Sequence, residues 1–152
     1  MGIFDRFSSS AVASKLSTSK TGQSEATEPQ SNLSGLNLRQ VMDAHVAWKG
    51  RLQKVLDGTS TEHFDIAKAS EDCHCFLGKW IYGEGKSMYG RLPEFESVRS
   101  AHAAFHACAG KVLAEHMLGN GDEATHLLST KFRSASNRNQ LELVRLFTAA
   151  RR

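Results

Sequence analysis

Long apolar runs are missing from this sequence. None approaches the roughly 20 residues that a helix needs to cross a bilayer, so we expect no membrane span. The first seven residues lack the apolar centre of a signal peptide, and Arg6 stands where a myristoylation motif requires Ser or Thr. Cysteine is scarce too: the odd number of three, without an export signal, predicts reduced thiols in a cytoplasmic protein.

A strong excess of charge is also missing, since the formal net charge is only +3. The stretch 131–152 is more basic, with Glu142 as its single acidic residue. It contains no recognisable nucleic-acid-binding module, and a basic helix face in contact with solvent explains it. We therefore expect no nucleic-acid partner.

The N-terminal part differs in composition from the rest of the chain. Residues 8–34 include twelve Ser or Thr and few large apolar side chains. Such a segment buries too little surface to offset the entropy lost on ordering, so we expect disorder. The predicted organisation is a disordered tail, 1–35, followed by a helical domain, 36–150.

Apolar residues recur at spacings of three and four from Leu38 onward, which is typical of amphipathic helices. The first predicted helix ends at Asp57-Gly58, and the second begins near Ser70 and breaks at 83–85. Whether 62–69 form an earlier turn of the second helix is open. Pro93 begins the third helix, which Gly119-Asn120-Gly121 closes. A fourth follows from about Asp122, with a stripe that includes Leu127, Leu128, Phe132, Leu141, Val144 and Phe147. These stripes predict an all-α fold, an antiparallel four-helix bundle.

Histidines interrupt two of the apolar stripes. His45 lies between Val41 and Leu52, and His102 and His106 are four residues apart on one face of the third helix. A single histidine in an apolar stripe is usually a hydrogen-bonded core residue. Three on the inward faces of one small bundle would be costly to bury without partners, whereas a shared metal ion satisfies all three. A cysteine thiolate as fourth ligand would complete a tetrahedral zinc site.

The pattern does not decide which cysteine this is. Cys73 and Cys75 are two apart, roughly 200° around a helix, so only one can face the ion. Periodicity favours Cys73, which shares a side with Leu77 and Trp80. Gly78, one turn after Cys75, instead favours Cys75, because a glycine allows a neighbouring helix to approach closely. Cys108 lies on the face opposite His106 and is read as a packed side chain.

Three segments, 43–49, 75–83 and 102–106, with Pro93-Glu94-Phe95 before the last, resemble the chemoreceptor zinc-binding (CZB) domain family over roughly residues 37–147. The combination Cys-x-Leu-Gly-x-Trp upstream of His-x-x-x-His carries the resemblance. Carried over residue by residue, it implies Zn²⁺ ligands at His45, Cys75, His102 and His106. Cys75 takes the thiolate role because it stands three residues before Gly and five before Trp. The resemblance also implies a helical bundle, often dimeric, that reports zinc or oxidants in bacterial signalling.

That family is found mostly in bacteria, where its members are attached to chemoreceptors or cyclic-di-GMP cyclases. This sequence shows neither a receptor coiled coil nor a Gly-Gly-Asp/Glu-Glu-Phe signature, so we expect the output either to lie in another chain or to be absent. We expect a homodimer whose partner is a chemoreceptor or a diguanylate cyclase, as in chemotaxis or cyclic-di-GMP signalling. The alternative is a structural zinc bundle that serves as an adaptor or dimerisation module. Four protein ligands leave zinc no open position for water, so we do not expect an enzyme.

Overall fold

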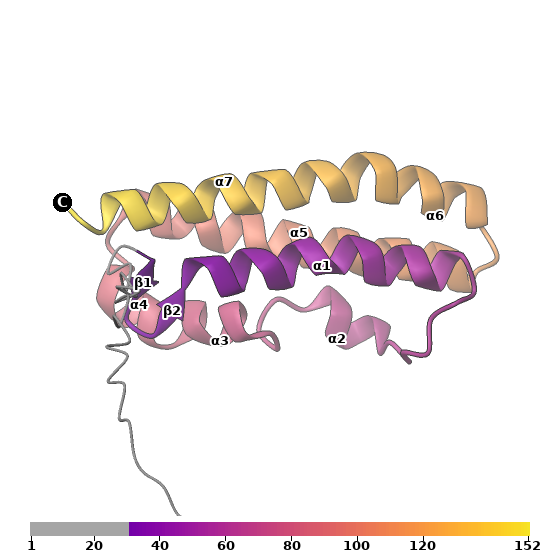
Figure 1. The fold of residues 1–152 in the computed structure, drawn as a ribbon, viewed down its shortest axis with the longest axis horizontal. Helices are drawn as coiled ribbons and strands as arrows, with labels where there is room; N and C mark the ends of the chain where they lie inside the picture. The colour runs from indigo at the N-terminus through magenta and orange to yellow at the C-terminus, as the bar shows by residue number, and fades with distance from the viewer. Residues whose placement is uncertain (1–30) are drawn as a thin grey trace, which may run out of the picture.

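The computed structural model describes residues 31–152, and this part of the chain is mainly helical (Figure 1). Its elements in chain order are β1 (Asn32–Leu33), β2 (Leu36–Asn37), α1 (Leu38–Leu56), α2 (Ile66–Ser70), α3 (Phe76–Tyr82), α4 (Glu84–Tyr89), α5 (Pro93–Met117), α6 (Gly121–Leu127), the π-helix η1 (Leu128–Phe132) and α7 (Arg133–Ala149). In Figure 1, α1, α5 and the continuous column α6–η1–α7 lie along the long axis of the molecule. The short helices α2 and α3 follow one another beside α1. Among the described residues no helix is long and apolar enough to cross a membrane.

The folded part begins earlier than the sequence predicts. Strands β1 and β2 form an antiparallel hairpin whose turn, Ser34-Gly35, has positive φ at both residues, as a two-residue hairpin turn requires. Leu33 and Leu36 are buried. The expectation of disorder is therefore wrong for 31–34, because Asn32 and Leu33 pair with β2, Ser34 forms the turn, and Leu33 contributes apolar surface to the core. The rest of the expected tail, 1–30, lies outside the described residues.

Helix α1 begins and ends where the stripe predicts. The Asn37 side chain accepts a hydrogen bond from the Gln40 N–H, 3.0 Å, as an N-cap does. Asp57 is the C-cap, and Gly58 follows with φ +72°, a value that favours glycine. Helix α5 likewise starts at Pro93, as predicted.

The second predicted helix is wrong as a single element. Ser70 ends α2 instead of starting a helix, and a loop, 71–75, separates it from α3. Cys75, in an extended conformation, is the residue that caps the start of α3. The expected all-α fold is thus confirmed to the extent that the described part of the chain is mainly helical. The second helix of the expected four-helix bundle, however, is replaced by two short helices and a loop.

The last column also differs from its predicted stripe. Leu141 and Val144 are exposed, whereas Asn139 and Glu142 are buried together with the neighbouring apolar residues Leu143, Leu146 and Phe147. The inward face of this column runs from Phe132 through positions 139, 143 and 146. Its helical period is hard to recognise in the sequence because Asn139 and Glu142, which are also buried, are polar. The column turns without interruption through the π-helical segment η1.

A polar layer divides the core into two apolar clusters. One cluster lies toward the hairpin and includes Val41, Val98 and Leu143; the other includes Leu52, Phe105 and Phe132. Along each column, a polar residue stands between the members of the two clusters: His45 on α1, His102 on α5 and Asn139 on α7. The fold therefore places the predicted histidines at mid-length of the helices.

Candidate metal centre

The structure brings together the four residues that the sequence singled out. One ligand atom from each of His45, Cys75, His102 and His106 lies within 4.8 Å of all the others. The three histidines are buried, and Cys75 is half-buried. They come from α1, from the start of α3 and from α5, so a single ion at this point would join three separate segments.

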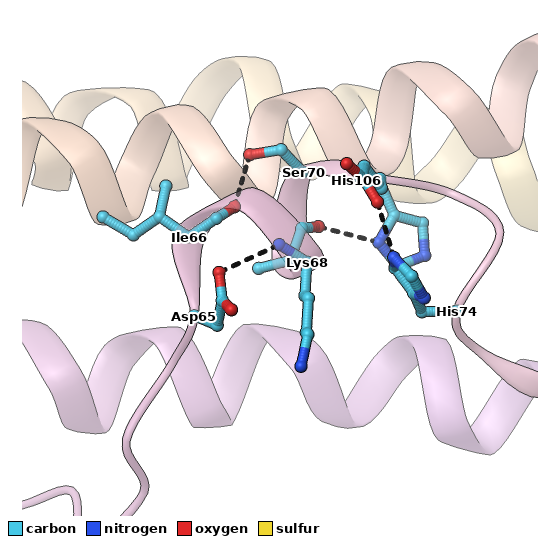
Figure 2. A network of polar contacts seen from close by, with 8 residues as sticks. Asp65, Ile66, Lys68, Ser70, His74 and His106 are labelled. Carbon is cyan, nitrogen blue, oxygen red and sulfur yellow. Dashed lines mark hydrogen bonds and ion pairs between the residues drawn. The ribbon is translucent and has the colours of Figure 1, made fainter.

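Two of the histidines are oriented by backbone carbonyls. His45 Nδ1–H donates to Val41 O, 2.7 Å, and His106 Nδ1–H donates to Ala69 O, 2.9 Å. Figure 2 shows the second of these contacts at the end of α2. In both rings the remaining nitrogen, Nε2, is buried and has no hydrogen-bond partner among the described residues. Fixing one nitrogen in this way leaves the other deprotonated and available as a ligand.

The third histidine faces the cysteine. His102 Nε2 lies 3.2 Å from Cys75 Sγ. The angle of a tetrahedron and ordinary Zn–N and Zn–S bond lengths place two such ligand atoms about 3.6 Å apart. Only a small adjustment therefore separates this contact from shared coordination.

Close backbone packing holds Cys75 in place. Cys75 Sγ accepts the N–H of Gly78, 3.3 Å, in the position of an N-cap side chain. A Cβ added at Gly78 would lie 1.8 Å from the carbonyl oxygen of Asp72. The loop 71–75 thus lies directly against the first turn of α3. A glycine is needed at position 78 because of this contact with the loop. The close approach of a neighbouring helix, which the sequence suggested, is not the reason.

The other end of the loop is held by α5. A Cβ added at Gly110 would lie 1.8 Å from Ser70 Oγ, so α2 and α5 pack at close range. The Ser70 hydroxyl donates to Ile66 O, 2.7 Å, and the Asp65 side chain caps α2 at the N–H of Lys68 (Figure 2). These contacts position the carbonyl of the adjacent Ala69 for His106.

Burial sets the protonation states of the site. Burial lowers the pKa of His102 to about 2, with a further contribution from the neighbouring imidazoles. It lowers the pKa of His45 and of His106 as well, against the opposing effect of their backbone hydrogen bonds. Burial also raises the pKa of the Cys75 thiol, partly offset by the Gly78 N–H. The imidazoles are therefore neutral ligands at pH 7, and a metal ion would have to displace the thiol proton.

These residues fit zinc. The unpaired Nε2 atoms of His45 and His106 would be costly to bury without a shared partner, and His102 turns its Nε2 to the Cys75 sulfur at the same point. Three nitrogen donors and one sulfur donor make up a ligand set that is typical of tetrahedral zinc. Such a set leaves no position for water, so it differs from the open sites of zinc hydrolases.

The sequence missed the buried polar residues of α7. Asn139 is fully buried, and neither its amide nitrogen nor its amide oxygen has a hydrogen-bond partner among the described residues. Glu142 is buried as well and pairs with Arg145, 3.1 Å. The signal for Asn139 would have been a polar residue at a position where the helical period predicts a core residue. The apolar residues Leu141 and Val144 indicated a different face of the helix instead. Cys73 is exposed and does not join the four residues.

Comparison with known families identifies this region. Residues 45–113 match the family model of the chemoreceptor zinc-binding domain. The chain therefore contains a zinc-binding domain, and all four residues of the cluster lie within the matched range. No curated protein and no solved structure is significantly similar to the chain.

Proposed function

We propose that this chemoreceptor zinc-binding domain holds one Zn²⁺ through His45, Cys75, His102 and His106 and regulates a signalling partner in response to zinc or oxidants. The observation that carries the proposal is the convergence of one thiol and three neutral, buried imidazoles within 4.8 Å. The closed ligand set supports a regulatory role over hydrolytic chemistry, so we infer that the protein is not an enzyme.

Access to the sulfur supports oxidant sensing. A groove of about 240 Å³ between α1 and the start of α3 is lined by both His45 and Cys75. A peroxide molecule that enters this groove would transfer an oxygen atom to the thiolate, giving sulfenic acid and hydroxide. The Cys75 sulfur is the one anionic donor of the set, so its oxidation removes the strongest attraction for the metal ion.

The contacts of α3 supply a route by which this change could reach the surface. Cys75 caps α3, and Trp80, about one and a half turns later, belongs to the core cluster near the hairpin. Trp80 Nε1 donates to Ser34 O, 3.1 Å, and the indole stacks on Tyr89, 5.8 Å between ring centroids. The Tyr89 hydroxyl in turn lies 3.1 Å from Ser34 Oγ. A shift of α3 would therefore move the β1–β2 hairpin.

The partner part of the proposal rests on the family. We infer a bacterial protein that acts in the cytoplasm as a homodimer and docks on a chemoreceptor or a diguanylate cyclase. The exposed apolar side chain of Phe76, which lines the groove, supports a docking role for this face.

The test is a peroxide titration of zinc-loaded protein in which Cys73, Cys108 and Trp48 are replaced by Ala, Ala and Phe. Cys75 is then the one thiol, and Trp80 is the one indole. We expect zinc release together with a change in fluorescence, both reversed by a reductant. If zinc stays bound and the fluorescence is unchanged, the proposal of oxidant sensing is wrong.

A further inference from the structure

A second group of metal-binding side chains lies on the loop that precedes Cys75. Ligand atoms of Glu71, Cys73 and His74 lie within 4.8 Å of one another, and all three residues are exposed. Like the buried centre, this group offers a thiol and an imidazole as donors. A carboxylate takes the place of the two further histidines. None of the three belongs to the cluster described above.

The loop holds these donors in a defined arrangement. His74 Nε2 lies 2.5 Å from Glu71 Oε2, so the carboxylate orients the imidazole. The backbone at Asp72, between the donors, lies against Gly78 too closely to admit a Cβ there. Neighbouring packing thus limits the freedom of the exposed loop before any metal binds, which reduces the entropy lost on binding.

The donor types favour zinc over other divalent ions. Thiolate and imidazole are poor ligands for Mg²⁺ and Ca²⁺ but bind Zn²⁺ well. Ligand atoms around one zinc ion lie about 3.3–3.7 Å apart, so side-chain rotations would suffice to close a set already within 4.8 Å. Three protein donors leave a fourth position for water, which makes the site open and its ion exchangeable.

We propose that Glu71, Cys73 and His74 form a second zinc site, exposed and weaker than the buried one. Its ion binds at higher free zinc concentrations and exchanges directly with solvent. The site lies on the loop that ends at Cys75, and Figure 2 places His74 near His106, a proposed ligand of the buried centre. Where the proposed function also holds, one loop therefore responds to two ranges of zinc concentration.

The experiment is equilibrium dialysis of the full-length protein against a series of buffered free zinc concentrations. We expect two zinc ions per chain at the upper end of the series. The double variant Cys73→Ser/His74→Gln should lose the weaker equivalent and keep the tighter one. The matched control Cys108→Ser/His63→Gln, which also removes one thiol and one imidazole, should keep both.

The outcomes separate this inference from the proposed function. A single zinc ion in the wild type, or a second one that persists in Cys73→Ser/His74→Gln, overturns the exposed site. In the first case, Glu71 and His74 form an ion pair and nothing more. The variant Cys75→Ser tests the buried centre alone, and we expect it to lose the tighter zinc ion. If the tighter ion stays bound, the proposed function is contradicted, whereas the exposed site is still tested by Cys73→Ser/His74→Gln.

Discussion

The Cys75 sulfur and the His102 Nε2 nitrogen lie 3.2 Å apart although one comes from the loop before α3 and the other from α5. The contact is possible because Cys75 stands at the first turn of α3, where an extended backbone turns its side chain toward α5. His45 and His106 present their free Nε2 atoms to the same point. Replacing His45, His102 or His106 should therefore lower the affinity for zinc more than replacing any other histidine of the chain.

Replacing His102 or His106 by Ala should lower zinc affinity by more than the roughly 10–100-fold that is typical for loss of an outer-shell partner. The physical reason is that each change removes one donor of a closed set. Competition with a chelator measures the affinity, and His126→Ala, an exposed position, is the control. Equal affinities for all three variants would contradict the proposed ligands.

Gly78→Ala should lower both the free energy of unfolding and the affinity for zinc. Its Cβ would meet the Asp72 carbonyl oxygen at 1.8 Å, which must push away the loop that carries Cys75. Overpacking of this kind costs about 1–3 kcal/mol. Urea unfolding with and without zinc measures the two effects.

The control is Gly50→Ala on α1, where an added Cβ meets nothing within 4 Å. It should raise the free energy of unfolding by about 0.5–1 kcal/mol, as Ala does in a helix interior. If Gly78→Ala behaves like Gly50→Ala, the close packing of the loop against α3 does not position Cys75.

Asn139→Leu should stabilise the protein. The amide is fully buried, and neither of its polar atoms has a partner among residues 31–152. An unsatisfied buried polar group costs about 1–3 kcal/mol, and an apolar side chain of similar size avoids that cost. Asn137→Leu, at an exposed position of the same helix, should change the free energy of unfolding by less than about 0.5 kcal/mol. Destabilisation by Asn139→Leu would mean that the amide has a partner in solution.

The metal-free protein should lose stability as the pH falls below about 6.5, the ordinary histidine pKa. Burial lowers the pKa of the three site histidines in the folded state, so below this pH the unfolded chain binds protons that the folded chain does not. Each neutral buried histidine then contributes a slope of about 1.4 kcal/mol per pH unit, and stability is fully present above pH 7.

Urea unfolding of the metal-free protein between pH 7 and pH 5 checks this slope. His102→Gln, which removes the histidine whose pKa burial lowers to about 2, should show a shallower decline than the wild type. Identical slopes would show that His102 is not kept neutral in the folded state.

The sequence predicts the histidines of the site but not the geometry of its cysteine. His45, His102 and His106 interrupt helical stripes, and a stripe identifies inward positions by period alone. Cys75 lies instead in a loop, so the argument from angles around a helix did not apply to it. Asn139 was not predicted as an inward residue because Leu141 and Val144 indicated a different face of α7, and which face packs on α5 is settled only by the fold.

X-ray absorption at the zinc edge tests the central claim most directly. The protein is loaded with one equivalent of zinc, so that the tighter site fills first. The account predicts one sulfur at about 2.3 Å and three nitrogen ligands at about 2.0–2.1 Å, with histidine ring scattering. Cys73→Ser, which removes the thiol of the exposed site, should keep the sulfur signal, and the double variant Cys73→Ser/Cys75→Ser should lose it. A spectrum with no sulfur, or one whose sulfur disappears in Cys73→Ser and not in Cys75→Ser, would contradict the proposed zinc centre.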